Sequence, residues 1–346
     1  MRFPSILAVL LIQGMWSPAF AQEASQPSAL TRILDAELAR WPATTGIYVK
    51  NLGSGETAVV RGEQHFESAS TIKVAAMVLA YQMSEQKKLD LDSRYEIKAA
   101  DFRGGSGIFK YNDVGLKPTL RDVITQMIAT SDNTATDIMV AKVGGVQRLN
   151  EFLRQSGYAT LAMNRPTNDY FRERYEALDP AHRALTPEQV FALVTDRPDI
   201  TSKHAALIAQ VKDETARASS DVKKRLDMAW EGEPQWFGIA TPAQMGRLLE
   251  SIERCTVNTQ ASCAEMRRIL RTQQVRHKIP HYLSVPVGNK TGDTRGVTND
   301  VAIVYARSGP LVIASYNMNV VGPIAEQDDR VGQLARRIVD YFDGTP

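Results

Sequence analysis

Ser70 and Lys73, three positions apart, are the residues of this chain whose types and spacing best suit catalysis. Side chains at i and i+3 lie on one face of a helix, so the hydroxyl and the amine can meet. The apolar run 74–80 that follows predicts a buried helix. Burial lowers the pKa of a lysine and lets the neutral amine accept a proton from a hydroxyl. The pair predicts an activated nucleophile, and a simple capping serine at a helix start is the alternative.

Two polar triplets could complete a site with this serine. The S-D-N triplet 131–133 follows the apolar segment 120–129, and alone it is typical of a helix N-cap. The K-T-G triplet 290–292 follows the segment 282–287, which we expect to be a strand. On an edge strand, lysine and threonine offer an ammonium and a hydroxyl to an anion, and glycine lets a ligand approach the backbone. Alone, such a lysine is typical of a blunted strand edge.

S-x-x-K, S-D-N and K-T-G, in this order, resemble the motif set of class A β-lactamases and penicillin-binding proteins. The segments 105–109, 131–136, 144–145, 241–245 and 290–300 are similar to that family as well. The resemblance implies a serine hydrolase that opens β-lactam amides through an acyl-enzyme, confers antibiotic resistance and needs no cofactor. Its partner would be a small β-lactam or a related acyl substrate.

The resemblance also implies a role for each motif residue. Ser70 would be acylated, Lys73 would help to deprotonate it, and Ser131 would pass a proton to the leaving nitrogen. Substrate contacts would come from Asn133, which binds the side-chain amide, from Lys290, Thr291 and Gly292 beside the substrate carboxylate, and from Asp293. The backbone N–H groups of Ser70 and Asp293 would form the oxyanion hole, with the Asp293 side chain pointing away.

One block departs from the family. The E-x-x-L-N motif that supplies the deacylating base is absent, and Thr167 stands near the expected glutamate. An insertion at about 166–236 contains Glu173, Glu176 and Glu231, each a candidate replacement base or a solvated surface carboxylate. Two alternatives therefore stay open. One is a penicillin-binding D-alanyl peptidase or esterase with poor β-lactam turnover, and the other is a non-catalytic module that binds β-lactams or cell-wall fragments.

The surrounding pattern predicts an α+β fold of the β-lactamase and transpeptidase type. Strands are expected at 46–49, 57–60, 282–287, 300–306 and 311–316, giving an antiparallel sheet built from both chain ends. Residues 22–65 and 275–346 would form this sheet part, with helices at 30–38 and 332–342. Residues 66–274 would be helical, and helices at 186–194 and 203–228 would make the insertion all-α.

Length, net charge, the N-terminal segment and the cysteines indicate which partners and which cell compartment to expect. The chain has 346 residues and a formal net charge of +2, which gives no reason to expect nucleic acid or a membrane surface as partner. Residues 1–21 read as a secretory signal and imply a periplasmic protein, which we expect to be monomeric and without a membrane span. In an exported protein, Cys255 and Cys263 favour a local disulfide over free thiols. The cysteines and histidines show no metal-ligand spacing.

Overall fold

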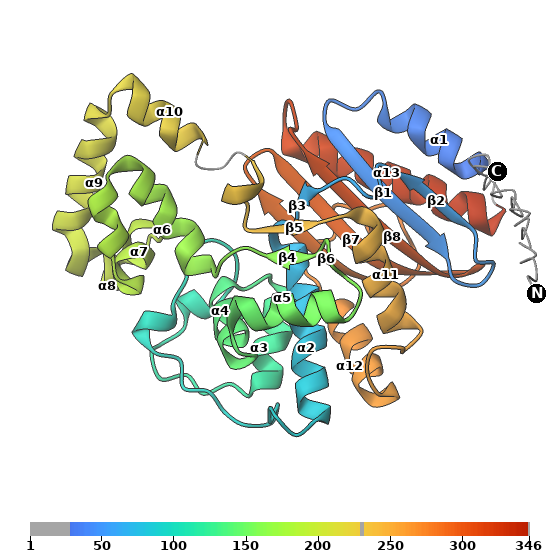
Figure 1. Ribbon diagram of the computed structural model, residues 1–346, viewed down its shortest axis with the longest axis horizontal. Helices are drawn as coiled ribbons and strands as arrows, with labels where there is room; N and C mark the ends of the chain where they lie inside the picture. The colour runs from blue at the N-terminus through green and yellow to red at the C-terminus, as the bar shows by residue number, and fades with distance from the viewer. Residues whose placement is uncertain (1–27, 229–231, 345–346) are drawn as a thin grey trace, which may run out of the picture.

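The larger sheet joins strands from both ends of the chain (Figure 1). The computed structural model describes residues 28–228 and 232–344, so the expected signal 1–21 lies outside the described residues. The sheet has five antiparallel strands in the order β2-β1-β8-β7-β6. Their bounds are β1 Thr44–Asn51, β2 Thr57–Val60, β6 Val287–Thr294, β7 Val297–Ala306 and β8 Gly309–Met318. The predicted α+β fold with a sheet from both chain ends is confirmed.

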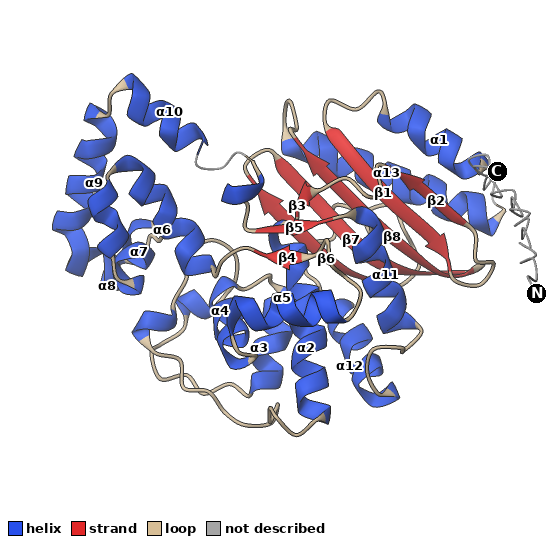
Figure 2. Ribbon diagram, viewed as in Figure 1, coloured by secondary structure: helices blue, strands red, loops and turns tan. Residues whose placement is uncertain are grey.

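Helices pack on both faces of this sheet (Figure 2). On one face, α1 (Ala29–Leu38) and α13 (Ile324–Asp343) bury their apolar residues against the strands. On the other face lies a helical part centred on α2 (Lys73–Glu85), which is buried from Lys73 to Tyr81. A helix that is apolar on every side needs neighbours on every side, so α2 becomes the centre of the core.

The remaining helices of this part surround α2. They are α3 Leu120–Ala129, α4 Asn133–Lys142, α5 Gly145–Gln155, α11 Pro242–Glu253 and α12 Gln260–Leu270. A small sheet in the order β3-β5-β4 lies between the helical part and the large sheet, with β3 Phe66–Glu67, β4 Ala162–Met163 and β5 Gly238–Ala240. Its first strand leads directly into the Ser70 segment.

The insertion forms a group of helices at one side of the molecule (Figure 1). They are α6 Thr167–Leu178, α7 Pro187–Leu193, α8 Pro198–Thr201, α9 Ala205–Arg217 and α10 Ser220–Met228. The prediction of a single helix at 203–228 is wrong. The helix is interrupted at residues 218–219, which separate α9 from α10. Ser219 Oγ accepts a hydrogen bond from Val222 N at 3.3 Å, which caps a new helix rather than continuing the old one.

The strand expected at 282–287 is also wrong. The segment before residue 287 is a loop, and β6 begins at Val287. Pro280 and Pro286 remove two backbone donors from that segment, which favours turns over a sheet strand. As a result the K-T-G triplet 290–292 lies inside edge strand β6 instead of after a strand.

The predicted disulfide is confirmed between Cys255 and Cys263, whose Cα atoms are 5.6 Å apart. It connects the end of α11 with the first turns of α12. Helix α12 begins at Gln260, because Thr259 caps it by accepting a hydrogen bond from Ser262 N. Cys263 therefore lies within the helix.

Candidate active site

Ser70 lies in a short 3-10 helix, Ala69–Ile72, directly before α2. The preceding residue, Ala69, has a φ of +45°, a left-handed conformation that costs energy for a residue with a side chain. Edge strand β6 passes so close that a Cβ on Gly292 would lie 3.0 Å from Ser70 N. Glycine is required there, and the close approach brings the backbone of β6 to the Ser70 N–H.

Lys73 is fully buried, and desolvation lowers its pKa to about 7. Its amine donates to Ser131 O at 2.7 Å, Asn133 Oδ1 at 2.9 Å and Ser131 Oγ at 3.2 Å. The expected contact with Ser70 is not among its hydrogen bonds in the described part of the chain. The amine instead lies beside Ser131 and Asn133 of the S-D-N triplet.

The S-D-N triplet forms the turn into α4. Ser131 has a φ of +55°, which aims its hydroxyl at two lysines. Asp132 fixes this turn, because its carboxylate accepts from Ala135 N at 2.9 Å and from Ile108 N at 2.7 Å. Asn133 donates to Gly104 O at 2.9 Å while it accepts from Lys73.

Lys290 reaches the same hydroxyl from β6. Its amine donates to Ser131 Oγ at 2.9 Å and to Thr291 O at 2.6 Å. Burial, and then the nearby Lys73, lower the pKa of Lys290 well below its usual value. An anionic ligand would reverse this effect, since an opposite charge favours the ammonium form.

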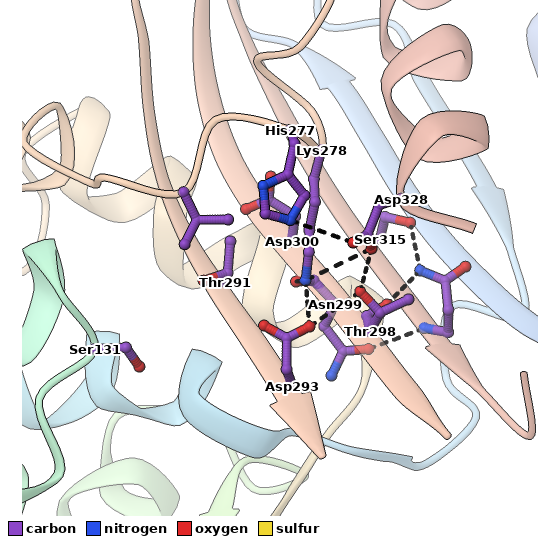
Figure 3. Close-up of polar contacts among 12 residues, drawn as sticks. Ser131, His277, Lys278, Thr291, Asp293, Thr298, Asn299, Asp300, Ser315 and Asp328 are labelled. Atoms are coloured by element: carbon purple, nitrogen blue, oxygen red, sulfur yellow. Dashed lines mark hydrogen bonds and ion pairs between the residues drawn. The ribbon is translucent and has the colours of Figure 1, made fainter. Parts of the chain in front are cut away.

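Asp293 follows the K-T-G triplet, and its side chain turns towards Lys278 (Figure 3). Its Oδ1 accepts from Lys278 Nζ and, at 3.1 Å, from Thr298 Oγ1. These two hydrogen bonds hold the Asp293 carboxylate next to Lys278 and Thr298.

A pocket of about 440 Å³ opens above Ser70. The predicted residues Ser70, Asn133 and Asp293 line it; Lys73, Ser131, Lys290 and Thr291 are buried. The other lining residues are Ala69, Gly105, Ser106, Thr167, Tyr170, Phe171, Arg174, Phe237, Thr294 and Arg295.

Helix α6 supplies a wall of this pocket that the sequence analysis missed. Thr167, Tyr170, Phe171 and Arg174 all line the pocket and follow the i, i+3, i+4, i+7 spacing of one helical face. That spacing was a readable signal. Tyr170 also packs edge-on against Phe237, with ring centroids 5.7 Å apart.

The N-terminus of α6 is clamped by Asp137 of α4. Its Oδ1 accepts from Thr167 N at 2.7 Å, its Oδ2 accepts from Asn168 N at 3.0 Å, and Arg103 Nε donates to it at 2.6 Å. Thr167 is 3% exposed, and its Oγ1 has no hydrogen-bond partner among the described residues. This leaves an unpaired hydroxyl beside the pocket.

Two of the three candidate replacement bases, Glu173 and Glu176, do not line the pocket. Glu173 pairs with Arg165 and Glu176 with Arg183, and Glu231 lies outside the described residues. Asp293 is the one acidic residue among the described residues that line the pocket.

Glu67 is a buried carboxylate that the sequence analysis missed. Desolvation raises its pKa to about 7, and it accepts from Ala69 N at 2.9 Å and Phe237 N at 3.0 Å. Lying on β3 with its oxygens on these N–H groups, it positions the backbone next to Ser70.

The described residues contain no cluster of three or more potential metal-ligating His, Cys, Asp or Glu side chains. Within the same residues, no helix is long and apolar enough to cross a membrane.

The five-stranded sheet and its helical part define the class of β-lactamase and transpeptidase folds. The chain is similar to the structure of a β-lactamase from Sphaerobacter thermophilus, with a TM-score of 0.67 and 23% identity over 91% of this chain and 98% of that one. It is also similar to PBP-A, with a TM-score of 0.69 and 19% identity over 92% and 97% of the two chains. An ancestral class A β-lactamase gives a TM-score of 0.67 at 20% identity over 90% and 99%.

Sequence comparison leads to the particular family. The model of the Beta-lactamase enzyme family matches residues 29–342. β-Lactamase Toho-2 of Escherichia coli is 26% identical over 91% of this chain and 90% of its own. β-Lactamase PSE-4 of Pseudomonas aeruginosa is 36% identical over 33% of this chain, and that match spans only 40% of PSE-4. The chain belongs to the β-lactamase enzyme family.

Proposed function

We propose that this protein is a serine hydrolase that opens β-lactam amides through an acyl-enzyme on Ser70. The observation that carries the proposal is the shared Ser131 hydroxyl, which lies 3.2 Å from Lys73 Nζ and 2.9 Å from Lys290 Nζ beside the Ser70 pocket. Two amines that meet on one hydroxyl provide a path for protons between nucleophile and leaving group.

In the proposed reaction, Ser70 Oγ attacks the lactam carbonyl carbon and transfers its proton to Lys73. The Lys73 amine turns from Asn133 towards Ser70 for this step. The carbonyl oxygen becomes an oxyanion, which the backbone N–H groups of Ser70 and Asp293 stabilise. The C–N bond then breaks, and the ring nitrogen takes a proton from the Ser131 hydroxyl. Lys73 then gives its extra proton to Ser131.

Substrate contacts in the proposed complex follow from the charges around the pocket. Lys290 and Thr291 hold the substrate carboxylate by charge-assisted hydrogen bonds, beside Gly292. Asn133 binds the side-chain amide. Bound carboxylate would also raise the lowered pKa of Lys290 and keep its amine charged.

Hydrolysis of the acyl-enzyme adds a water oxygen to the ester carbonyl, and Ser70 Oγ leaves and regains a proton. This water needs a general base. The pocket has Thr167 at the place where a carboxylate base would act, and a threonine hydroxyl is not such a base. General-base help is typically worth about 10²–10⁴-fold. Slow deacylation favours a second candidate function, a penicillin-binding D-alanyl peptidase or esterase of the same fold.

Steady-state turnover separates the candidates. Purified protein is assayed with benzylpenicillin, a D-alanyl-D-alanine peptide and a simple aryl ester, with Ser70→Ala as control. The proposal expects β-lactam turnover that the control lacks. Peptide or ester cleavage with negligible β-lactam turnover supports the second candidate. Reversible binding that survives in the control, without turnover of any substrate, supports a non-catalytic binding module.

We also propose export to the periplasm, with residues 1–21 removed as a signal. The Cys255–Cys263 disulfide supports an oxidising compartment. We also propose that the protein is a monomer. N-terminal sequencing of periplasmic protein should begin at Gln22, and retention of Met1 would contradict export.

A further inference from the structure

Asp293 creates an electrostatic problem that follows from the proposed function. Its backbone N–H is proposed to stabilise a developing oxyanion, yet its side chain carries a half-exposed carboxylate. A negative charge at this place repels both an anionic substrate and the oxyanion. A site that acylates Ser70 needs this charge compensated.

Lys278 provides the compensation. It is 1% exposed, and its amine donates to Asp293 Oδ1 beside edge strand β6 (Figure 3). The same amine donates to Asn299 O at 3.3 Å and lies 3.8 Å from Asp328 Oδ1. A buried ammonium is costly without close partners, so these contacts restrict where the Lys278 amine can lie.

The surrounding side chains hold this arrangement in place. Thr298 Oγ1 lies 3.1 Å from Asp293 Oδ1 and 2.5 Å from Asp328 Oδ1, and so connects the two carboxylates. His277 Nε2 lies 3.3 Å from the other oxygen of Asp328. The nearby Asp300 carboxylate accepts hydrogen bonds from Asn289 Nδ2 at 2.9 Å and from Ile279 N at 3.1 Å. Lys278 is thus the cation in direct contact with Asp293, while Lys290 acts on that carboxylate without an ion pair.

We propose that Lys278 is a positioning residue for the acylation step. It neutralises the Asp293 carboxylate and holds it in place, which leaves the Asp293 N–H facing Ser70 without an opposing charge. Lys278 acts through Asp293 and does not itself contact the substrate. The role rests on the proposed acyl-enzyme chemistry and goes beyond it by assigning a function to a residue outside the pocket.

The proposal is tested by the acylation rate of benzylpenicillin, followed by intact mass in rapid-quench experiments. Lys278→Met should slow acylation about tenfold, because the negative charge of Asp293 is then uncompensated near the developing oxyanion. Asp293→Asn should acylate faster than the wild type. The double variant Lys278→Met/Asp293→Asn should recover most of the rate, because no carboxylate is left to compensate.

Salt dependence separates electrostatic from structural roles. Raising NaCl from about 0.05 M to about 0.5 M should speed acylation of Lys278→Met, because salt screens the exposed charge. Lys50→Met is the matched control, since it removes a lysine from a partly buried ion pair with Glu250 and lines no part of the pocket. Its acylation rate should remain that of the wild type, even if its stability falls.

Any other result in these variants contradicts the proposed positioning role of Lys278. A double variant as slow as Lys278→Met, or a slow rate indifferent to salt, would show that Lys278 serves the substrate or the fold directly. If Lys278→Met does not fold, a tenfold loss in Asp293→Asn overturns the proposal by itself. Wild-type protein that forms no adduct overturns the proposed function, and this role with it.

Discussion

Two buried lysines that meet on the Ser131 hydroxyl are the main feature at the residue scale. Lys73 comes from α2 and Lys290 from β6, and burial together with the nearby Lys73 lowers the pKa of Lys290. The pair of positive charges is unfavourable without a ligand, and an anionic substrate relieves it. The site is therefore suited to substrates that carry a carboxylate.

The pH dependence of acylation should report the state of Lys73. Its pKa is lowered to about 7 by burial, and only the neutral amine can accept the serine proton. The acylation rate should therefore rise as pH increases through about 7 and level off above it. Lys73→Arg stays protonated and should lose about 10²–10⁴-fold at every pH. Stopped-flow acylation between pH 5 and 9 measures this, and a flat wild-type profile would argue against Lys73 as base.

Deacylation should respond to a carboxylate at position 167. Thr167→Glu places a base beside the pocket, and deacylation should accelerate by about 10²–10⁴-fold. Thr167→Gln is the matched control, since its amide has the same size and cannot take the proton. The rate of adduct loss in intact-mass time courses gives the comparison. Equal rates in the two variants would mean that the base lies elsewhere.

Sequence alone predicted which residues would be candidates, but not how they are connected. Spacing placed Ser70 and Lys73 on one helical face, whereas the Lys73 amine bonds to Ser131 and Asn133 instead. That choice depends on the left-handed backbone at Ser131, and no local pattern encodes it. Glu67 was missed because its partners are backbone N–H groups, which have no sequence signature.

At the element scale, Asp137 couples α4 to α6. It caps α6 from another helix, since its oxygens accept from Thr167 N and Asn168 N. Asp137→Ala should lower the free energy of unfolding by about 1–2 kcal/mol, as the loss of an N-cap does. Urea denaturation measures the change, with Asp137→Asn, which keeps one acceptor oxygen, as the milder control. Unchanged stability in Asp137→Ala would show that the clamp contributes nothing.

Elements were predicted best where hydrophobic periodicity was strong. The segment 120–129 corresponds to α3, Leu120–Ala129, because its apolar face packs in the core. The predicted boundaries were wrong where a single residue decides them, as at Pro286 before β6 and at Ser219 between α9 and α10. Prolines and capping serines act locally and override the average pattern around them.

At the scale of the whole molecule, stability is distributed unevenly. Helices α2 and α3 contribute many residues to the main core, whereas α9 buries Val211 alone and α10 buries no side chain. Local opening costs least where few apolar contacts hold an element. In hydrogen exchange followed by mass spectrometry, amides of α9 and α10 should exchange well before those of α2. Simultaneous exchange would indicate that the insertion unfolds only with the core.

The overall architecture was predictable because the sheet strands occur at both chain ends and helices fill the middle. The pocket was less predictable, because it lies where parts distant in sequence meet: the Ser70 segment, β6 and α6. The insertion therefore shapes the pocket although most of its helices lie to one side (Figure 1).

The most direct test of this account is the intact mass of the wild-type protein over time after mixing with benzylpenicillin. The protein should gain the mass of one penicillin, the adduct should map to Ser70, and the adduct should decay as free enzyme returns. Ser70→Ala should gain no mass. Folded wild-type protein that shows neither adduct nor loss of penicillin would contradict the assignment of Ser70 as an acylated nucleophile.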